Sequence, residues 1–428
     1  MHVKWSATFV AATIMLPQPR MRELFDLVIV GAGQAGLAMS RELARRDLEH
    51  VVLERGRVGQ TWRGRWDSFR LVTPNWSMQL PDQPYDGENP DAFDPRDEIV
   101  GFLERYAARF EVPVQEGVAV RSLRPSVGGG FVLETSLGSL EARAVVLATG
   151  AYQRPLRVRG SSALPADLLQ LDVAGYERPE ALPDGAVLIV GSGQSGCQIA
   201  EELAEAGRDV FLSCGRAPWL PRRIGDHDFV WWLKESGYMD AGVETLPEPR
   251  ARLWANVLAS GRHGGHDLHL RTLHELGVVL LGHFSGADGQ RARFAADLSA
   301  SLAWGDQRYA QLMELFGTFA TERGIPRPEA PDPAPLDCEA RESLDLKGFG
   351  AVVFAGGFRP DYESWVQIPG GFDDLGFPIH EDGASLAAEG LYFVGVHFLR
   401  KRKSSLFVGV GEDAAIIADK IARERTAM

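Results

Sequence analysis

Cysteine is scarce in this chain, since only Cys197, Cys214 and Cys338 occur among 428 residues and no two of them are close in sequence. This scarcity excludes a disulfide-bonded scaffold, a zinc site built from thiolates and a Cys-x-x-Cys redox motif. Positive charge is also in deficit, because 45 Lys and Arg face 58 Asp and Glu and leave a net charge of −13. Such a chain repels phosphate backbones, so we expect no nucleic-acid partner.

Long apolar runs are absent as well. No run reaches the ~18–20 residues that a membrane-spanning helix needs, so we expect no membrane span. Residues 1–20 hold a shorter apolar stretch that ends near Pro17 and Pro19, as a signal peptide would. A clear small-x-small cleavage site is missing and Met21 stands directly before the first predicted strand. We therefore favour an N-terminal extension or a misplaced start codon, and a cytoplasmic protein.

Glycine, in contrast, is abundant, with 47 residues that fall in informative places. The 45% of hydrophobic and 24% of charged residues are ordinary for a globular protein, and the length suggests two or three domains. One pattern occurs twice, about 160 residues apart: a short apolar strand, a Gly-x-Gly-x-x-Gly turn, a helix and a second strand. The first copy covers residues 26–30, 31–36, 37–46 and 50–54, and the second covers 186–190, 191–196, 197–206 and 209–213.

Each copy predicts a nucleotide-binding βαβ unit. The glycines allow a tight turn and a close approach of the backbone to a pyrophosphate, whose charge then lies at the helix N-terminus. The strand ends differ: Glu54 follows Gly36 by 18 residues and suits a ribose diol, whereas Cys214 holds the same place after Gly196, with Arg216 two residues on. A guanidinium can pair with a 2′-phosphate that a carboxylate would repel. The first site therefore fits FAD or NAD, and the second fits NADPH.

Two further apolar strands, at 144–150 and 351–357, end in small residues and glycine. Proline-rich stretches at 155–183 and 326–335 suggest connections between domains. We predict an α/β fold with two Rossmann-like dinucleotide-binding domains, the second inserted in the first. The boundaries are an extension at 1–20, an FAD-binding domain at 21–155 and 330–428, and an NADPH-binding domain at 156–329. Its residues 290–322 look helical and are expected to cap a site.

The combined motifs resemble the class B flavin monooxygenases, a family that includes flavin-containing, Baeyer–Villiger and N-hydroxylating enzymes. The resemblance runs from about residue 25 to 425 and rests on the two glycine motifs together with several shorter segments. These are Gly59-Gln-Thr-Trp62, Arg65-Trp-Asp-Ser68 through Thr73-Pro74, Ala148-Thr-Gly150, Gly357-Phe-Arg-Pro-Asp361, Gly390 to Gly395 and Gly409-Val-Gly-Glu-Asp413.

The resemblance implies the cofactors FAD and NADPH, and the motifs and the resemblance together give the candidate binding residues. For FAD these are Gly31, Gly33, Gln34, Ala35, Gly36, Glu54, Arg55, Thr61, Trp62, Thr73, Val120, Ala148, Thr149, Gly150, Gly411 and Asp413. For NADPH they are Gly191, Gly193, Gln194, Ser195, Gly196, Ser213, Arg216 and Arg222.

The implied activity is an NADPH- and O2-dependent monooxygenation of a small organic substrate at an N, S or carbonyl centre, through a flavin C4a-(hydro)peroxide. Two departures from the family pattern bear on this activity. Asp172 stands where the family carries a His, and a flavin-facing Asn has only Asn75 as its nearest match. Asn75 is therefore the candidate catalytic residue. A flavin reductase or oxidase, and a non-catalytic flavin-binding regulator, remain as alternatives.

Three further features have two interpretations each. His263, His266, His269 and His274 could suggest a metal site, but glycines interrupt their helical spacing, and we expect loop or surface histidines and no metal. The basic segment 399–403 is more consistent with a local anion-binding loop near a cofactor than with a nucleic-acid or membrane patch. Trp231 and Trp232 could line a substrate cleft or pack in the core. The sequence leaves the substrate and the oligomeric state open.

Overall fold

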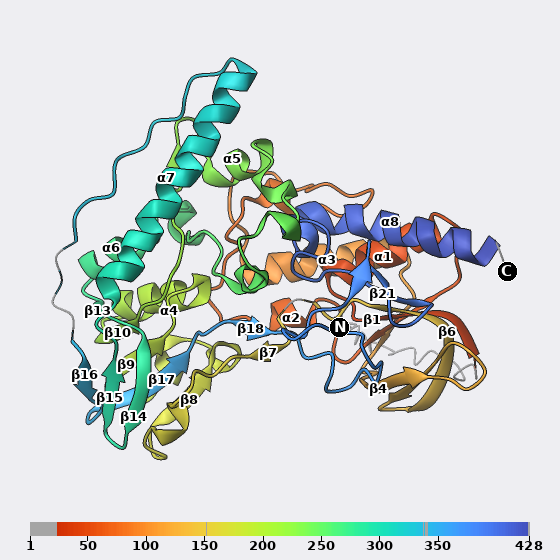
Figure 1. Cartoon of the computed structure of the whole chain (residues 1–428), viewed down its shortest axis with the longest axis horizontal. Helices are drawn as coiled ribbons and strands as arrows, with labels where there is room; N and C mark the ends of the chain where they lie inside the picture. Colours follow the sequence, from red (N-terminus) through yellow and green to blue (C-terminus); the bar gives the residue numbers. More distant parts are fainter. Residues whose placement is uncertain (1–23, 151, 337, 339–340, 427–428) are drawn as a thin grey trace, which may run out of the picture.

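Two larger β-sheets, one mixed and one parallel, dominate the molecule in the computed structural model and are flanked by helices (Figure 1). The structure describes residues 24–426 except 151, 337, 339 and 340, so the predicted extension at 1–20 lies outside the described residues. Each sheet contains one of the two glycine motifs in its first strand-to-helix turn. The predicted α/β fold with two Rossmann-like units is thus confirmed.

The first sheet is built on strands that are buried on both faces, as parallel sheets require. Its parallel part has the order β21-β6-β1-β2-β3, and short antiparallel strands extend it. Helices α1, α3 and α8 lie together on one side of it in Figure 1. The bounds are β1 Leu24–Val30, β2 Val51–Glu54, β3 Val114–Glu116, β4 Val120–Pro125, β5 Phe131–Thr135, β6 Gly138–Leu147, β19 His380–Glu381, β20 Ala384–Ser385, β21 Leu391–Phe393, α1 Gln34–Ala44, α2 Gln60–Arg63, α3 Arg96–Arg109 and α8 Phe407–Thr426.

The second sheet is parallel throughout, with the order β13-β10-β9-β17-β8. A three-stranded antiparallel sheet, β14-β15-β16, and several helices accompany it. The bounds are β8 Leu169–Asp172, β9 Ala186–Val190, β10 Val210–Ser213, β11 Arg223–Ile224, β12 His227–Asp228, β13 Val279–Leu281, β14 Phe284–Asp288, β15 Arg291–Phe294, β16 Ser343–Asp345, β17 Phe349–Phe354, α4 Gln194–Glu205, α5 Phe229–Glu235, α6 Leu270–Glu275 and α7 Leu298–Arg323.

The second domain extends further along the chain than the predicted boundary at residue 329. Strand β17 lies in the middle of the second sheet, where Ala351 pairs with Val187 of β9 and with Leu169 of β8. The chain returns to the first domain only at β18 (Phe358–Arg359), which pairs with β7 (Arg154–Pro155) between the two sheets. This small ribbon, and not the proline-rich stretch 326–335, makes the second connection, because β17 needs β9 and β8 to satisfy its backbone hydrogen bonds.

Helix α7 begins later than the sequence indicates, since residues 291–294 form β15. The helix runs along the outer edge of the second domain, and its upper end passes α5 (Figure 1). Its apolar side packs on the core: Tyr309 stacks on Trp219 with 4.8 Å between ring centroids, and Phe316 lies 5.7 Å from Trp232. Trp232 is only 3% exposed, so the core interpretation of this tryptophan holds.

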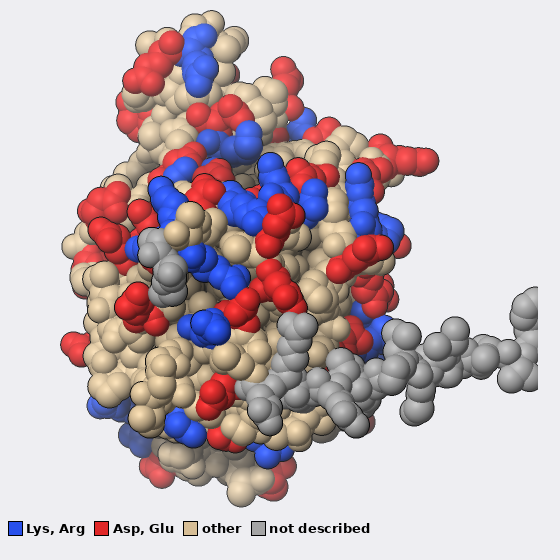
Figure 2. Space-filling view, turned by 90° about the vertical axis from the view of Figure 1, so that its right-hand side faces the viewer, with Lys and Arg blue, Asp and Glu red and all other residues tan. Residues whose placement is uncertain are grey.

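One face of the molecule is mixed in charge. Figure 2 shows the face at the C-terminal end of α8, where acidic and basic side chains are interspersed and no area of one sign dominates. Among the residues that the structure describes, no helix combines the length and apolar character that crossing a bilayer requires.

Candidate functional site

A cavity of about 970 Å3 connects the two dinucleotide-binding units. It is lined by residues that follow the carboxyl ends of strands in both sheets, which is where open α/β sheets bind their ligands. Glu54, the last residue of β2, lies in its wall, and so does Arg216, which follows β10. Both glycine motifs open into this one space, so ligands held by the two motifs would meet in it.

The glycine turns have the shape that a pyrophosphate needs. Gly31 and Gly191 have φ values of +107° and +113°, and a Cβ there would lie 2.6 Å and 2.5 Å from the carbonyl oxygens of Ala148 and Ala355, respectively. A Cβ on Gly33 would instead meet no protein atom within 4 Å and would project into the cavity. No side chain caps α1 or α4, so the N–H groups of their first turns are available to an anion. The turns therefore fit dinucleotides.

The third glycine of each motif serves packing only. A Cβ on Gly36 would lie 1.8 Å from the oxygen of Gly31, and one on Gly196 would lie 1.9 Å from that of Gly191. Neither glycine lines the cavity. Their role is to let the helix start against its own turn.

Glu54 is held firmly in the cavity wall. It is 7% exposed, and its two carboxylate oxygens accept 2.8 Å hydrogen bonds from the backbone N–H groups of Ala32 and Gly56. Each oxygen keeps a lone pair, so the carboxylate can still accept bonds from a ribose diol. At the matching strand end of the second unit, after β10, Cys214 is buried. Arg216, two residues further on, is exposed and has no ion-pair partner among the described residues. The two strand ends therefore differ in charge, with a carboxylate in the first unit and a guanidinium in the second.

In each motif the glutamine after the second glycine connects the start of the helix to a distant loop by hydrogen bonds. Gln34 donates from Nε2 to the Ser405 oxygen (3.2 Å) and accepts from Nε1 of Trp62 (3.0 Å). Gln194 likewise donates to the Ala259 oxygen (2.5 Å) and accepts from the Ala259 N–H (3.1 Å). Both glutamines line the cavity, but their amides are engaged by protein.

Most of the predicted cofactor residues are brought together by the fold. Those that line the cavity are Gly31, Gly33, Gln34, Ala35, Glu54, Arg55, Thr61, Trp62, Thr73, Val120, Ala148, Thr149, Gly150, Gly191, Gly193, Gln194, Ser195, Ser213 and Arg216. The hydroxyl of Ser213 is already used, since it donates to the Gly282 oxygen at 3.0 Å and accepts from the Phe284 N–H at 2.8 Å. Six predicted residues are not in the lining: Gly36, Gly196, Asn75, Arg222, Gly411 and Asp413.

Asn75, the predicted catalytic residue, is fully buried in a loop beside the cavity. Its Nδ2 donates to the Asn89 oxygen and to Asp94 Oδ1, both at 2.9 Å, and to Tyr85 Oη at 3.1 Å. Its Oδ1 accepts from the Asp94 N–H at 2.7 Å. With donors and acceptor both satisfied, this amide holds the 75–94 loop together, and Asn75 does not line the cavity.

Arg222 is likewise committed to structure. Its Nε donates to Asp228 Oδ2 at 2.7 Å and its Nη1 donates to the Val72 oxygen at 2.7 Å, and the guanidinium lies 4.1 Å from the centroid of the Phe93 ring. The side chain is only 4% exposed. Because Val72 and Phe93 belong to the first domain, Arg222 joins the two domains, and a role in binding NADPH has no geometric support.

The C-terminal helix meets the cavity at its start rather than at the predicted Gly411 and Asp413. Phe407 and Val408 line the space, while a Cβ on Gly411 would face Pro81 and Asp413 pairs with Arg400 at 3.2 Å. The expectation that residues 290–322 cap the site is also not met, because no residue of α7 lines the cavity.

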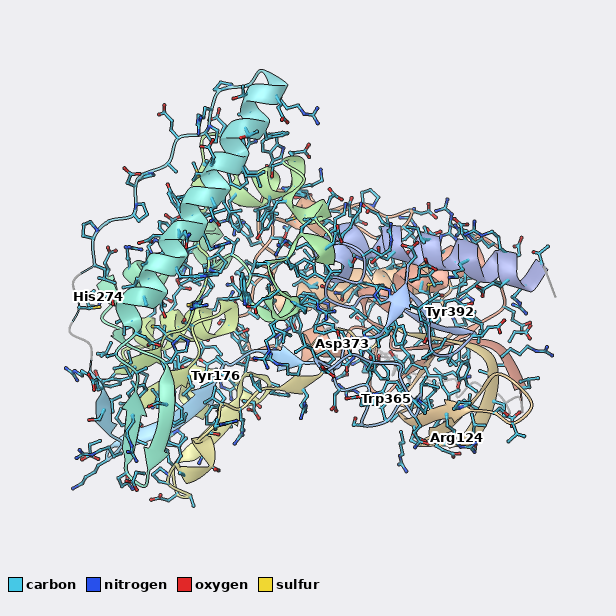
Figure 3. All side chains as sticks on the ribbon, viewed as in Figure 1. Arg124, Tyr176, His274, Trp365, Asp373 and Tyr392 are labelled. Carbon is cyan, nitrogen blue, oxygen red and sulfur yellow. The ribbon has the colours of Figure 1, made fainter. Side chains whose placement is uncertain are left out.

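The histidines have separate roles. His266 Nε2 lies 2.5 Å from Glu201 and His263 Nε2 lies 3.3 Å from Glu205, while His269 caps α6. His274 lies at the far edge of the second domain (Figure 3) and does not line the cavity. Within residues 24–426, as far as they are described, no group of three or more His, Cys, Asp or Glu could hold a metal ion.

Sequence reasoning missed a chain of aromatic and polar contacts in the cavity wall. Tyr152 lies 5.4 Å from His397, ring to ring, and the Arg65 guanidinium lies 5.9 Å from the Tyr152 ring. His397 Nδ1 is 2.9 Å from Ser405 Oγ. Burial, together with the charge of Arg402, lowers the pKa of His397 to about 4, so its imidazole is neutral at pH 7. The available signal was position, since His397 follows the carboxyl end of β21.

Two glycine-motif domains that share one cavity define a class of protein, the oxidoreductases that bring a flavin and a nicotinamide dinucleotide together. A model of the pyridine nucleotide-disulphide oxidoreductase family matches residues 28–236. The chain is 30% identical over 403 residues to an oxidoreductase of Geobacillus kaustophilus named CzcO-like, which covers 94% of this chain and 99% of that protein. It is 30% identical over 422 residues to the indole-3-pyruvate monooxygenase YUCCA4 of Oryza sativa, and the match covers 92% of this chain and 86% of that protein. The fold matches a flavin-containing monooxygenase from Stenotrophomonas maltophilia with a TM-score of 0.67 and 18% identity, over 94% and 100% of the two chains.

The chain therefore belongs to the class B flavin monooxygenase family, together with the CzcO-like oxidoreductases and the YUCCA monooxygenases. The predicted family and enzyme class are confirmed, and FAD and NADPH are the cofactors of this family.

Proposed function

We propose that this protein is an NADPH- and O2-dependent flavoprotein monooxygenase that oxygenates a small organic molecule in the cytoplasm. One observation carries the proposal: both dinucleotide motifs open into a single cavity, so a hydride donor on one side and a flavin on the other would share it. When bound, FAD would supply the redox chemistry that links NADPH to O2. The protein contributes binding, orientation and the exclusion of water.

The residues of the first motif would hold FAD. The α1 N-terminus at Gly33 and Gln34 would receive the pyrophosphate, and Glu54 would accept bonds from the ribose. Trp62 is held in place in the wall of this site, because its indole N–H donates to Gln34 and its ring stacks on Phe407 with 5.6 Å between centroids.

The residues of the second motif would hold NADPH. The α4 N-terminus at Gly193 and Gln194 would receive the pyrophosphate, and Arg216 would pair with the 2′-phosphate. Arg216 is suited to this role because no described carboxylate competes for it.

The wall between the two sites consists largely of apolar side chains. Phe69 lies 5.9 Å from Trp62, ring to ring, and Leu71, Val72 and Phe407 extend the same wall. Such a wall keeps bulk water from a reactive centre. The neutral His397 adds a polar group there without adding a charge.

A disulfide reductase has no support in this cavity. Cys197 and Cys214 are buried, and burial raises the pKa of both thiols, so neither would be a ready nucleophile. An uncoupled NADPH oxidase remains the alternative to a monooxygenase, and a regulator without turnover is the alternative of another class.

The decisive experiment follows both electrons and oxygen in the FAD-loaded enzyme. We expect NADPH to bleach the flavin without oxygen, and we expect ¹⁸O from ¹⁸O2 to enter one of a set of amines, sulfides and ketones. Peroxide release equal to NADPH consumption, with no labelled product throughout the set, would favour the oxidase. A flavin that NADPH does not reduce would favour the regulator.

A further inference from the structure

The loop between β21 and α8 carries four consecutive basic residues, 400–403, and three of them are neutralised. Their carboxylate partners lie on the outside of the cavity: Arg400 with Asp382 (2.9 Å) and Asp413 (3.2 Å), Lys401 with Asp240 (2.8 Å) and Glu412 (2.9 Å), and Lys403 with Asp240 (3.0 Å) and Glu412. This pairing accounts for most of the basic character that the sequence shows there.

Arg402 is the exception. It lines the cavity, and its guanidinium lies between two aromatic rings, 4.2 Å from the centroid of Tyr238 and 4.7 Å from that of Phe398. No ion pair or hydrogen bond joins that guanidinium to any residue that the structure describes, and its Nε is buried without an acceptor. Burial lowers the pKa of Arg402. An N–H group of a guanidinium that is buried without an acceptor is costly, unless a ligand supplies the acceptor.

The loop backbone holds Arg402 in this place. Its N–H donates to the Ala241 oxygen at 2.9 Å, which connects the loop to the second domain. Phe398 adopts a φ of +51°, a conformation that bulky residues rarely hold and that tends to occur at functional sites. The position of the cation is therefore built into the loop.

The cavity as a whole is short of negative charge. Of the described residues that line it, five are arginines and two are acids, Glu54 and Asp361. Arg252 is neutralised by Asp373 at 2.5 Å, and Asp373 lies in the middle of the molecule between the domains (Figure 3). Arg65, near Tyr152, has no carboxylate partner among the described residues, and its Nε is buried without an acceptor. The field inside the cavity thus favours anions, of which the dinucleotide phosphates would be one kind.

We propose that Arg402 binds a carboxylate of the substrate, so that the proposed monooxygenase acts on small organic acids. That the bound acid is a substrate rests on the proposed function, whereas the binding of a carboxylate at Arg402 does not. A planar carboxylate fits one guanidinium that is held between rings, whereas a phosphate usually gathers several cations. Tyr238, Met239 and Leu406 line the cavity beside Arg402 and offer an apolar surface to the body of the acid.

The test is a titration of the oxidised, FAD-loaded enzyme with benzoate, phenylacetate, hexanoate and their neutral amides, without NADPH. Calorimetry and the flavin spectrum report binding. We expect at least one carboxylate to bind on the order of tenfold or more tightly than its amide, and Arg402→Met to remove this difference. Arg402→Lys should keep part of it. Lys401→Met, which removes a charge from the same loop outside the cavity, should leave it unchanged.

Several results would overturn the proposal: no carboxylate bound by the wild type, equal affinity for acids and amides, or an unchanged preference in Arg402→Met. The dissociation constant of NADP+ is measured on the same variants. If Arg402→Met weakens NADP+ as much as the carboxylate, the residue binds the cofactor instead and the proposal is wrong. Because the titration uses neither NADPH turnover nor oxygen, its failure is distinguishable from failure of the monooxygenase proposal.

Discussion

Replacing Arg222 with Met should destabilise the protein without weakening NADPH binding. The substitution removes the cation from a pair whose side chains are 4% and 9% exposed, and it also removes the bond to the Val72 oxygen. Loss of one partner of a buried pair costs about 3–5 kcal/mol, because the other charge stays buried. Here Asp228 still accepts a 2.8 Å bond from the Val230 N–H, so we expect the lower end, about 3 kcal/mol. That corresponds to a fall in Tm of roughly 6–12 °C for a unit of 150–250 residues.

Thermal unfolding of the variants measures this loss, and titration with NADP+ measures the effect on binding. In Arg222→Met/Asp228→Asn the unpaired carboxylate is gone and Asn can still cap α5, so the double variant should be more stable than the single one. Arg223→Met, at the exposed neighbouring position, is the matched control. A loss below about 1 kcal/mol, or a weaker NADP+ affinity with intact stability, would refute the structural assignment of Arg222.

Three further predictions concern single residues. Arg216→Met should lower the preference for NADPH over NADH by roughly 10–150-fold, the value of a charge-assisted hydrogen bond to phosphate, as steady-state kinetics with both donors would show; an unchanged preference would remove the 2′-phosphate assignment. Asn75→Ala should cost about 1–3 kcal/mol of unfolding free energy and leave the rate of flavin reduction by NADPH unchanged. Slower reduction of the flavin with normal stability would restore the catalytic interpretation. The hydrogen bond to Glu201 raises the pKa of His266 above its ordinary value of 6.5, against the effect of burial. The stabilisation of the fold by protonated His266 is therefore complete below pH 6.5 and is lost as the pH rises through the raised pKa. The Tm difference between wild type and His266→Asn should shrink with rising pH, and a constant difference would contradict this.

The sequence predicts the parts of the site that depend on distance along one βαβ unit. Gly31, Glu54 and Arg216 are placed by their spacing from a strand end, and a strand end faces the cavity wherever the sheet lies. The order of strands in the second sheet is not encoded locally, which is why β17 appeared to belong to the first domain. Its place depends on the pairing of Ala351 with Val187, more than 160 residues away in sequence.

Pairing with other segments explains why two predicted site residues, Arg222 and Asn75, are structural instead. A sequence shows where an arginine is but not whether a carboxylate neutralises it, because the partner commonly comes from another segment. Arg222 appeared suitable for a phosphate, yet it is bonded to Asp228 and to Val72, 150 residues away. Asn75 appeared suitable for the flavin, yet Asp94 and Asn89 saturate its amide.

Whether a carboxylate neutralises an arginine also separates structural cations from ligand-binding cations around the cavity. A buried guanidinium with a carboxylate has its acceptor and gains little from a ligand, whereas one without an acceptor carries a desolvation cost that a bound anion relieves. Arg252 belongs to the first group through Asp373, and Arg65 and Arg402 belong to the second. Nucleotide phosphates account for an unpaired cation at Arg216, which follows a glycine-motif strand. Arg402, in contrast, follows neither motif and lies between Tyr238 and Phe398. Our assignment of a substrate carboxylate to Arg402 would explain why this one basic residue of four faces the cavity.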